Sequence, residues 1–114
     1  MNISENPQIK FLSKALDAYM LRQKVTAGNI ANIDTEGYTK KSVKFEEYLR
    51  NARTGQERHQ VQPSIESTGE RVDLDNEMIE MSDTQMRVQM VSRLLRHQMD
   101  IVRMGITGNS NIGS

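Results

Sequence analysis

The sequence contains no cysteine and no tryptophan, and its large aromatic residues are limited to three tyrosines and two phenylalanines. The absence of cysteine excludes disulfide bonds and thiol chemistry. Only 36 % of the residues are hydrophobic, so a large core would have to be built from aliphatic side chains and the eight methionines. A compact globular domain is therefore not expected from this composition.

The chain also lacks an excess of either charge, since fifteen Lys and Arg side chains balance fifteen Asp and Glu side chains. This balance predicts no general attraction to nucleic acid or to an anionic membrane, and it favours self-association. No apolar run reaches the length of about 18 residues that a membrane span needs. The first residues carry no basic segment followed by an apolar run, so we expect no cleaved signal peptide.

The first long pattern is helical and begins at Asn6 and Pro7, which suit the N-cap and the first position of a helix. We expect residues 1–6 to form a flexible N-terminus and residues 7–36 to form a helix. Apolar side chains recur there at three- and four-residue steps, as in the seam of a coiled coil or a bundle. The seam consists of Ile9, Leu12, Leu16, Tyr19, Thr26, Ile30 and Ile33.

The middle of the chain, residues 37–72, has mostly loop composition. The alternation of Val43 and Phe45 with polar residues predicts a short extended stretch. Beyond Arg50 the segment is rich in Gln, Glu, Ser, Gly and Arg, with few apolar side chains. We expect a mostly irregular linker or outer segment here.

A second long helix is expected over residues 73–104, with Asp73 or Asp75 as its cap. Two apolar stripes run along it, displaced by about 150° at 100° per residue. The first stripe contains Leu74, Met78, Met81, Val88, Leu95, Met99 and Val102. The second contains Ile79, Met86, Met90, Leu94, Ile101 and Met104. After Met104, the glycines and polar residues of 105–114 predict a helix stop and a flexible tail.

We therefore predict an all-α fold in which two long terminal helices pair as an antiparallel coiled-coil-like hairpin. The predicted intrachain contacts join Leu12, Leu16, Tyr19, Ile30 and Ile33 to Met78, Met81, Val88, Leu95 and Met99. The first helix can cover only one stripe of the second, so another subunit is expected against the other stripe. The predicted intersubunit residues are Ile79, Met86, Met90, Leu94 and Ile101.

The sequence offers little for catalysis, and we predict no catalytic residue, no cofactor and no metal site. His59 lies in a loop-like segment and His97 on a helix, without a second ligand at metal spacing. The acidic residues 73–77 lack the spacing and the glycine of a calcium loop. The three lysines at 40, 41 and 44 are interpreted as a solvated face. The protein is therefore expected not to be an enzyme.

One stretch carries a more specific signal, Asn29-Ile30-Ala31-Asn32 followed by Thr35, Gly37 and Tyr38. It resembles the signature near the N-terminus of bacterial flagellar basal-body rod proteins. The segments from Gly37 to Leu49 and from Val72 to Met78 are most similar to the short proximal-rod members of that family. Gly28 and Glu36 depart from the family pattern, which has Asn and Pro at these positions.

The resemblance implies a structural subunit of the proximal rod. Such a subunit would polymerise through its terminal helices into a hollow periplasmic tube that transmits torque and carries export. The implied partners are other copies, other rod proteins, the flagellar export apparatus and the basal-body adaptor at the rod base. The resemblance also implies export without a cleaved signal peptide, and it places the motif residues at the exit of the chain from the tube.

A different class of function explains the two stripes equally well. A cytoplasmic helical adaptor or export chaperone would use an apolar helix face to bind a partner helix. Two properties separate the hypotheses, because an adaptor hairpin has no need of the non-helical block from Gly37 to Leu49 and would not be secreted.

Overall fold

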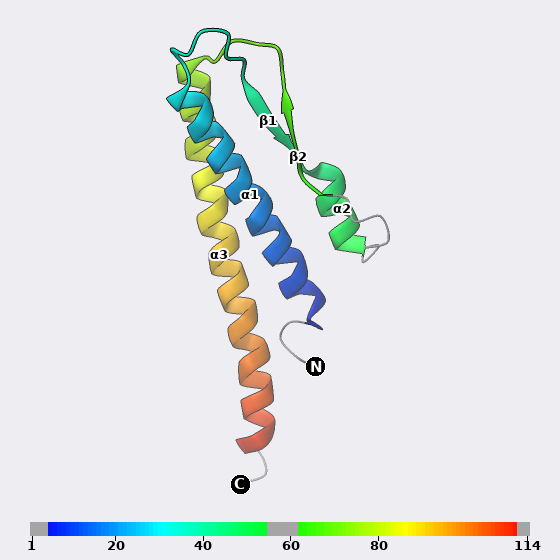
Figure 1. Ribbon diagram of the computed structural model, residues 1–114. Coiled ribbons are helices and arrows are strands. Elements are labelled where there is room, and N and C mark those ends of the chain that lie inside the picture. Colours follow the sequence, from blue (N-terminus) through cyan, green and yellow to red (C-terminus); the bar gives the residue numbers. More distant parts are fainter. Residues whose placement is uncertain (1–4, 55–61, 112–114) are drawn as a thin grey trace.

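The computed structural model describes residues 5–54 and 62–111, which form an elongated molecule of 68 × 30 × 15 Å (Figure 1). The elements follow the order α1 (Pro7–Ala31), β1 (Lys41–Lys44), α2 (Glu46–Thr54), β2 (Ser64–Ser67) and α3 (Leu74–Asn111). The two long helices lie side by side, and α3 extends past the start of α1 (Figure 1). No helix among the described residues is both long enough and apolar enough to cross a membrane.

Helix α1 begins where the sequence predicts. The Asn6 side chain accepts hydrogen bonds from the backbone N–H groups of Gln8 and Ile9, at 2.9 and 3.0 Å. These bonds satisfy two donors of the first turn that have no partner within the helix. The helix ends at Ala31, earlier than the predicted residue 36, because Asn32 caps it and the chain then turns.

Helix α3 begins at the predicted place but ends later. The Asp73 carboxylate accepts a hydrogen bond from the backbone of Asp75 at 3.1 Å, as an N-cap does. The predicted stop after Met104 is wrong, because α3 continues through Gly105 to Asn111. A glycine inside a helix costs only about 1 kcal/mol relative to alanine, which a helix of this length tolerates. The predicted flexible ends include residues 1–4 and 112–114, which lie outside the described residues.

The middle segment is more regular than predicted. Strands β1 and β2 pair antiparallel, with Val43 opposite Ile65, and α2 lies between them in sequence. The chain is mostly helical with two long helices, as predicted, but the all-α class misses this small sheet. The extended stretch predicted around Val43 corresponds to β1. Strand β2 carries one apolar residue and is exposed at every position, so it lacks an alternating pattern.

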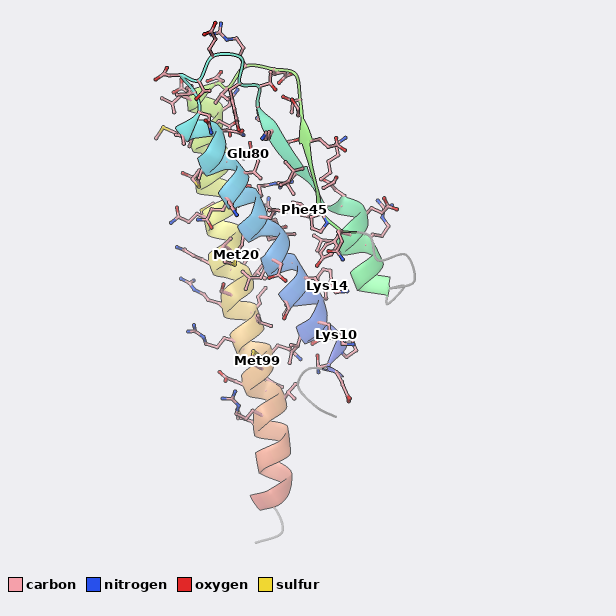
Figure 2. The ribbon with its side chains drawn as sticks, viewed as in Figure 1. Lys10, Lys14, Met20, Phe45, Glu80 and Met99 are labelled. Carbon is pink, nitrogen blue, oxygen red and sulfur yellow. The ribbon has the colours of Figure 1, made fainter. Side chains whose placement is uncertain are left out.

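The middle segment packs on α1, which lies between it and α3 (Figure 1). A core cluster forms here from Ala18, Val43, Phe45 and Tyr48, all buried. Phe45 points from the middle segment to α1 (Figure 2), and its ring meets Tyr19 edge-on, with the ring centroids 5.3 Å apart. The small side chain of Ala18 lets the middle segment approach the helix closely.

The residues predicted for the helix pairing are covered to different degrees. Most are half-buried: Leu12, Leu16, Tyr19, Ile30, Met81, Val88, Leu95 and Met99. Ile33 and Met78 are instead exposed. The fully buried side chains of the long helices include the polar residues Thr26 and Thr84. A coiled-coil-like seam through the predicted residues stays a prediction.

The position of Gly105 inside α3 gives a testable prediction. Nothing lies within 4 Å of a methyl group added there, and its backbone is helical. Gly105→Ala should therefore stabilise the protein by about 0.5–1 kcal/mol and increase the helical circular-dichroism signal. Gly37 has a positive φ of 78°, so Gly37→Ala serves as a control that should destabilise the protein. A loss of helix in Gly105→Ala would contradict the continuous α3.

Candidate functional site

The side chain of Asn29 joins the end of α1 to the start of the sheet. It is 1 % exposed, and its Nδ2 donates a hydrogen bond to the Lys41 carbonyl at 2.8 Å. Its Oδ1 accepts one from the Lys41 backbone N–H at 3.0 Å. The carboxamide thus pairs with both backbone groups of Lys41, as a neighbouring strand would. This contact fixes the inner edge of β1 against α1.

The turn after α1 folds back onto the same residue. Tyr38 donates its hydroxyl hydrogen to Asn29 Oδ1 at 2.8 Å. Asn32 donates from Nδ2 to the Gly28 carbonyl at 2.8 Å, and its Oδ1 accepts from the Thr35 hydroxyl at 3.1 Å. The motif residues therefore end the helix and position Tyr38 against its last turn.

A buried carboxylate completes the site from α3. Glu77 is fully buried, and its Oε2 accepts a hydrogen bond from Asn29 Nδ2 at 3.1 Å. Its Oε1 lies 3.0 Å from the ammonium of Lys40, which also lies 3.5 Å from Glu80. A buried charge needs such partners, because an unpaired carboxylate would lose several kcal/mol of hydration. We call Asn29, Tyr38, Lys40, Lys41 and Glu77 the Asn29–Glu77 cluster.

The cluster changes the pKa of the Lys40 ammonium. Its hydrogen bond to Glu77 raises the pKa of Lys40 above the ordinary value, and this effect outweighs the desolvation that lowers it. A lysine pKa that is raised on folding stabilises the folded state at every pH below the unfolded value of about 10.4. That stabilisation is lost as pH rises through the folded pKa.

Sequence reasoning found only part of this cluster. The resemblance singles out Asn29 and Tyr38 as motif residues at the exit of the chain, whereas Glu77 is considered only among the acidic residues 73–77. The interpretation of Lys40 as part of a solvated face is wrong, because its side chain is 22 % exposed and paired with Glu77. The sequence does carry a signal for the burial of Glu77. Met81 and Thr84 follow it at helical spacing and lie on the covered face of α3, so Glu77 lies on that face too.

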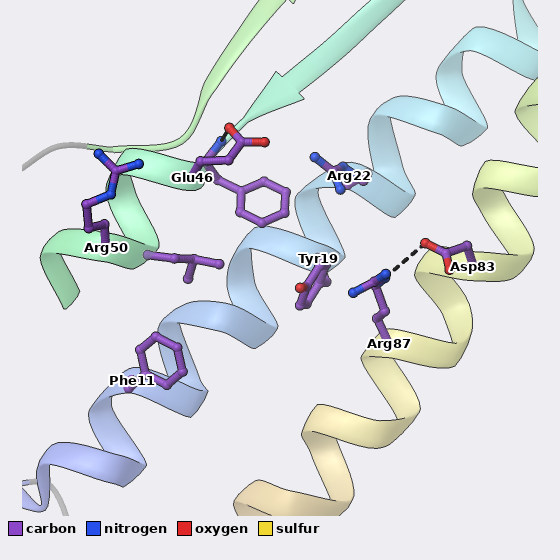
Figure 3. A pocket seen from close by; sticks show the side chains of 9 residues that line it. Phe11, Tyr19, Arg22, Glu46, Arg50, Asp83 and Arg87 are labelled. Atoms are coloured by element: carbon purple, nitrogen blue, oxygen red, sulfur yellow. Dashed lines mark hydrogen bonds and ion pairs between the residues drawn. The ribbon is translucent and has the colours of Figure 1, made fainter. Parts of the chain in front are cut away.

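A second polar site is a groove between α1, α2 and α3 (Figure 3), with a volume of about 550 Å³. The guanidinium of Arg22 lies 4.2 Å from the ring centroid of Phe45 and donates to the Val43 carbonyl at 3.1 Å. Arg87 Nε lies 2.9 Å from the carboxylate of Asp83. Arg22 therefore holds α1 to the middle segment, whereas the Arg87–Asp83 pair lies within α3. The guanidinium of Arg87 also lies 5.9 Å from the ring centroid of Tyr19 on α1.

The described residues bear on the sequence predictions for metal-binding side chains. They contain no group of three His, Asp or Glu side chains that could hold a metal ion. His97 is exposed on α3, and His59 lies outside the described residues. What the Asn29–Glu77 cluster can do chemically is to hold a helix, a turn and a second helix in one fixed arrangement.

Comparison with known proteins bears on these same residues. Residues 9–39 match the family model described as flagella basal body rod protein. The match covers α1 and the turn that follows it, including Asn29 and Tyr38 of the cluster. The chain is also 28 % identical, over 120 aligned positions, to the flagellar basal body rod protein FlgB of Bacillus subtilis (strain 168). That alignment covers 88 % of this chain and 93 % of the relative.

The resemblance to flagellar rod proteins is confirmed. Flagellar basal body rod proteins are structural components rather than an enzyme family, and the matches support a structural role in the rod of the flagellum. They likewise support location in the basal body and assembly with other rod components. The matched residues 9–39 include Asn29 and Tyr38, which belong to the Asn29–Glu77 cluster.

Removal of Asn29 should weaken the fold strongly. Asn29→Ala leaves the Lys41 backbone, the Tyr38 hydroxyl and Glu77 Oε2 without partners. A single buried polar group without a partner costs about 1–3 kcal/mol, so we expect a loss of roughly 3 kcal/mol or more. Urea unfolding measures this loss. Gln89→Ala removes a carboxamide at an exposed position of α3, and as the control it should cost about 0.5 kcal/mol or less.

Removal of the Lys40 ammonium should show a pH dependence of defined sign. Lys40→Met leaves the buried Glu77 carboxylate without its cation, and we expect a loss of about 1–3 kcal/mol at neutral pH. The difference in unfolding free energy between the two proteins should stay constant below pH about 10 and shrink above it. Denaturant titrations from pH 7 to alkaline pH measure this difference. Lys24→Met, at an exposed position, should give no such trend.

Proposed function

We propose that this chain is a structural subunit of the proximal flagellar rod. It would polymerise through its terminal helices into a hollow periplasmic tube that transmits torque and carries export. The observation that carries the proposal is the outer stripe of α3, which we define as Ile79, Met86, Met90, Leu94 and Ile101. These side chains are between 48 % and 68 % exposed. Apolar surface repeated along a helix of 38 residues is typical of a face that another subunit covers.

The arrangement of the elements suits lateral packing of such subunits. The middle segment lies on the far side of α1 from α3, so it leaves the outer stripe accessible (Figure 1). Within the subunit, the predicted helix-packing residues would join α1 to α3. A contact that repeats from copy to copy without closing builds a helical array.

Methionine suits the outer stripe of such an array. Met86 and Met90 both lie on it, and methionine side chains are unbranched and adapt to irregular surfaces. Within a helical tube, identical helices meet neighbours that are not all equivalent. Adaptable side chains would let one helix face pack against each of them.

The Asn29–Glu77 cluster would set the direction in which the chain leaves the tube. It joins the end of α1, the turn and the start of α3 through buried hydrogen bonds and an ion pair. A fixed turn keeps the middle segment at a constant angle to the helices. The middle segment would then reach neighbouring subunits from a defined position, as transmission of torque requires.

The proposal includes partners and a location. The partners would be other copies, other rod proteins, and the export apparatus and basal-body adaptor at the base of the rod. The chain would be exported without a cleaved signal peptide and would end in the periplasmic part of the basal body. An adaptor or export chaperone in the cytoplasm remains the second hypothesis, and the ordered sheet and α2 argue against it because a helix-binding hairpin needs neither.

Motility provides the test. The double variant Met86→Lys, Met90→Lys places two charges on the outer stripe, and we expect it to fold but to restore less than a tenth of the swimming of the unchanged chain. The assay uses a bacterium deleted for this gene, with isolated basal bodies probed for the chain. The control variant Gln85→Lys, Gln89→Lys adds the same charges at exposed polar positions of α3 and should swim normally.

The same assay separates the two hypotheses. A rod subunit is recovered in purified basal bodies, whereas an adaptor is recovered in the cytoplasm. Normal motility of the Met86→Lys, Met90→Lys variant, or absence of the unchanged chain from basal bodies, would contradict the proposal.

A further inference from the structure

The outer stripe of α3 has the same pattern in both directions from Met90. Ile79 and Ile101 are equally distant from Met90 in sequence, and so are Met86 and Leu94. The polar residues between them obey the same symmetry, since Asp83 and His97 are also equidistant from Met90. At 100° per residue, all seven positions fall within a sector of about 80° on one face of the helix. All seven side chains are exposed.

We propose that the free chain forms a closed dimer in which the outer stripe of α3 packs antiparallel against that of a second copy. A two-fold axis would pass beside Met90. Ile79 of each copy would then meet Ile101 of the other, and Met86 would meet Leu94. Such a contact uses the same surface on both copies, so association stops at the dimer.

The polar side chains of the stripe are complementary to those of a second copy in the antiparallel direction, and like charges oppose the parallel direction. In this register Asp83 of each copy lies opposite His97 of the other, which brings a carboxylate beside an imidazole twice. The Oδ2 atom of Asp83 accepts from Arg87 at 2.9 Å, while its Oδ1 has no partner among the described residues. The side chain of His97 likewise makes no hydrogen bond or ion pair with the described residues. A parallel pair would instead place Asp83 against Asp83, and like charges at a contact are unfavourable.

The shape of the surface fits the same register. An apolar groove of about 400 Å³ lies between the start of α1 and α3, lined mainly by Phe11, Leu12, Leu94 and His97. Met86 of the second copy arrives at the level of Leu94, where its unbranched side chain can fill this groove. The overlap from Ile79 to Ile101 spans roughly 33 Å of helix. Helix α1 covers the opposite face, and the middle segment lies beyond it (Figure 1).

The dimer is independent of the role in the rod, because it concerns the free chain alone. A closed contact covers the outer stripe without the open growth that a repeating contact would permit. The two proposals also fail separately, since motility and recovery in basal bodies test the rod subunit, and cross-linking of the purified chain tests the dimer.

Cysteine cross-linking tests the register directly, because the chain contains no cysteine of its own. We expect Met90→Cys to form a disulfide-linked dimer in most molecules under mild oxidation. Ile79→Cys and Ile101→Cys should cross-link only when the two variants are mixed. Gln89→Cys, adjacent in sequence but outside the stripe, is the control and should cross-link at least tenfold less. Linkage of Ile79→Cys to itself, or no linkage of Met90→Cys, would overturn the proposal.

Charge reversal tests the paired polar residues by a second measurement. Asp83→Lys should raise the dimer dissociation constant at least tenfold in sedimentation experiments, and Asp83→Lys with His97→Glu should restore it. Circular dichroism of each variant establishes that α3 is retained. An unchanged chain that sediments as a monomer throughout, or that associates only with a different rod protein, shows that another partner covers this face and overturns the dimer.

Discussion

The arrangement of the described residues depends on one buried charge, the carboxylate of Glu77. It has no access to water, so its stability in the folded chain depends on the Asn29 carboxamide and the Lys40 ammonium. These partners come from α1 and from the segment before β1, far from Glu77 in sequence. Satisfying this one carboxylate therefore requires α1, the turn and α3 to take up their positions together.

A protein with few aromatic side chains has limited means to fix such positions by packing alone. The core cluster around Phe45 fastens the middle segment to α1, and it uses one of only two phenylalanines in the chain. The apolar contacts between the long helices are mostly half-buried, so they leave freedom that directional bonds restrict. The hydrogen bonds and the ion pair of the Asn29–Glu77 cluster fix the positions of α1, the turn and α3 relative to one another. Burial of apolar side chains elsewhere contributes the larger share of the stability.

The sequence predicted those features of the fold that depend on residues close together in the chain. Asn6 with Pro7 and Asp73 mark the starts of the two long helices, because capping involves residues within one turn. The end of α3 was missed, since a glycine that can stop a helix can also lie within one, and the choice depends on the whole helix. The residues of the rod signature lie in the last turn of α1 and in the turn after it, and their hydrogen bonds could not be foreseen from spacing.

The parts that sequence reasoning missed depend on partners far away in the chain. Strand β2 has no pattern of its own, and it is a strand because β1 lies beside it. Glu77 resembles any acid near a helix start until Asn29, 48 residues earlier, is seen to contact it. A single sequence carries no direct record of such pairs.

The pairing of Asn29 with Lys41 also bears on how the small sheet avoids unwanted growth. A strand edge with free backbone groups can recruit another chain and begin an aggregate. On β1 that edge is occupied by a side chain from α1, with Arg22 bonded to the Val43 carbonyl further along. Within the described part of the chain, the edge left open to further strands is that of β2, which is four residues long and carries Glu66 paired with Lys44. These contacts thus keep the small sheet from becoming a route of unwanted association.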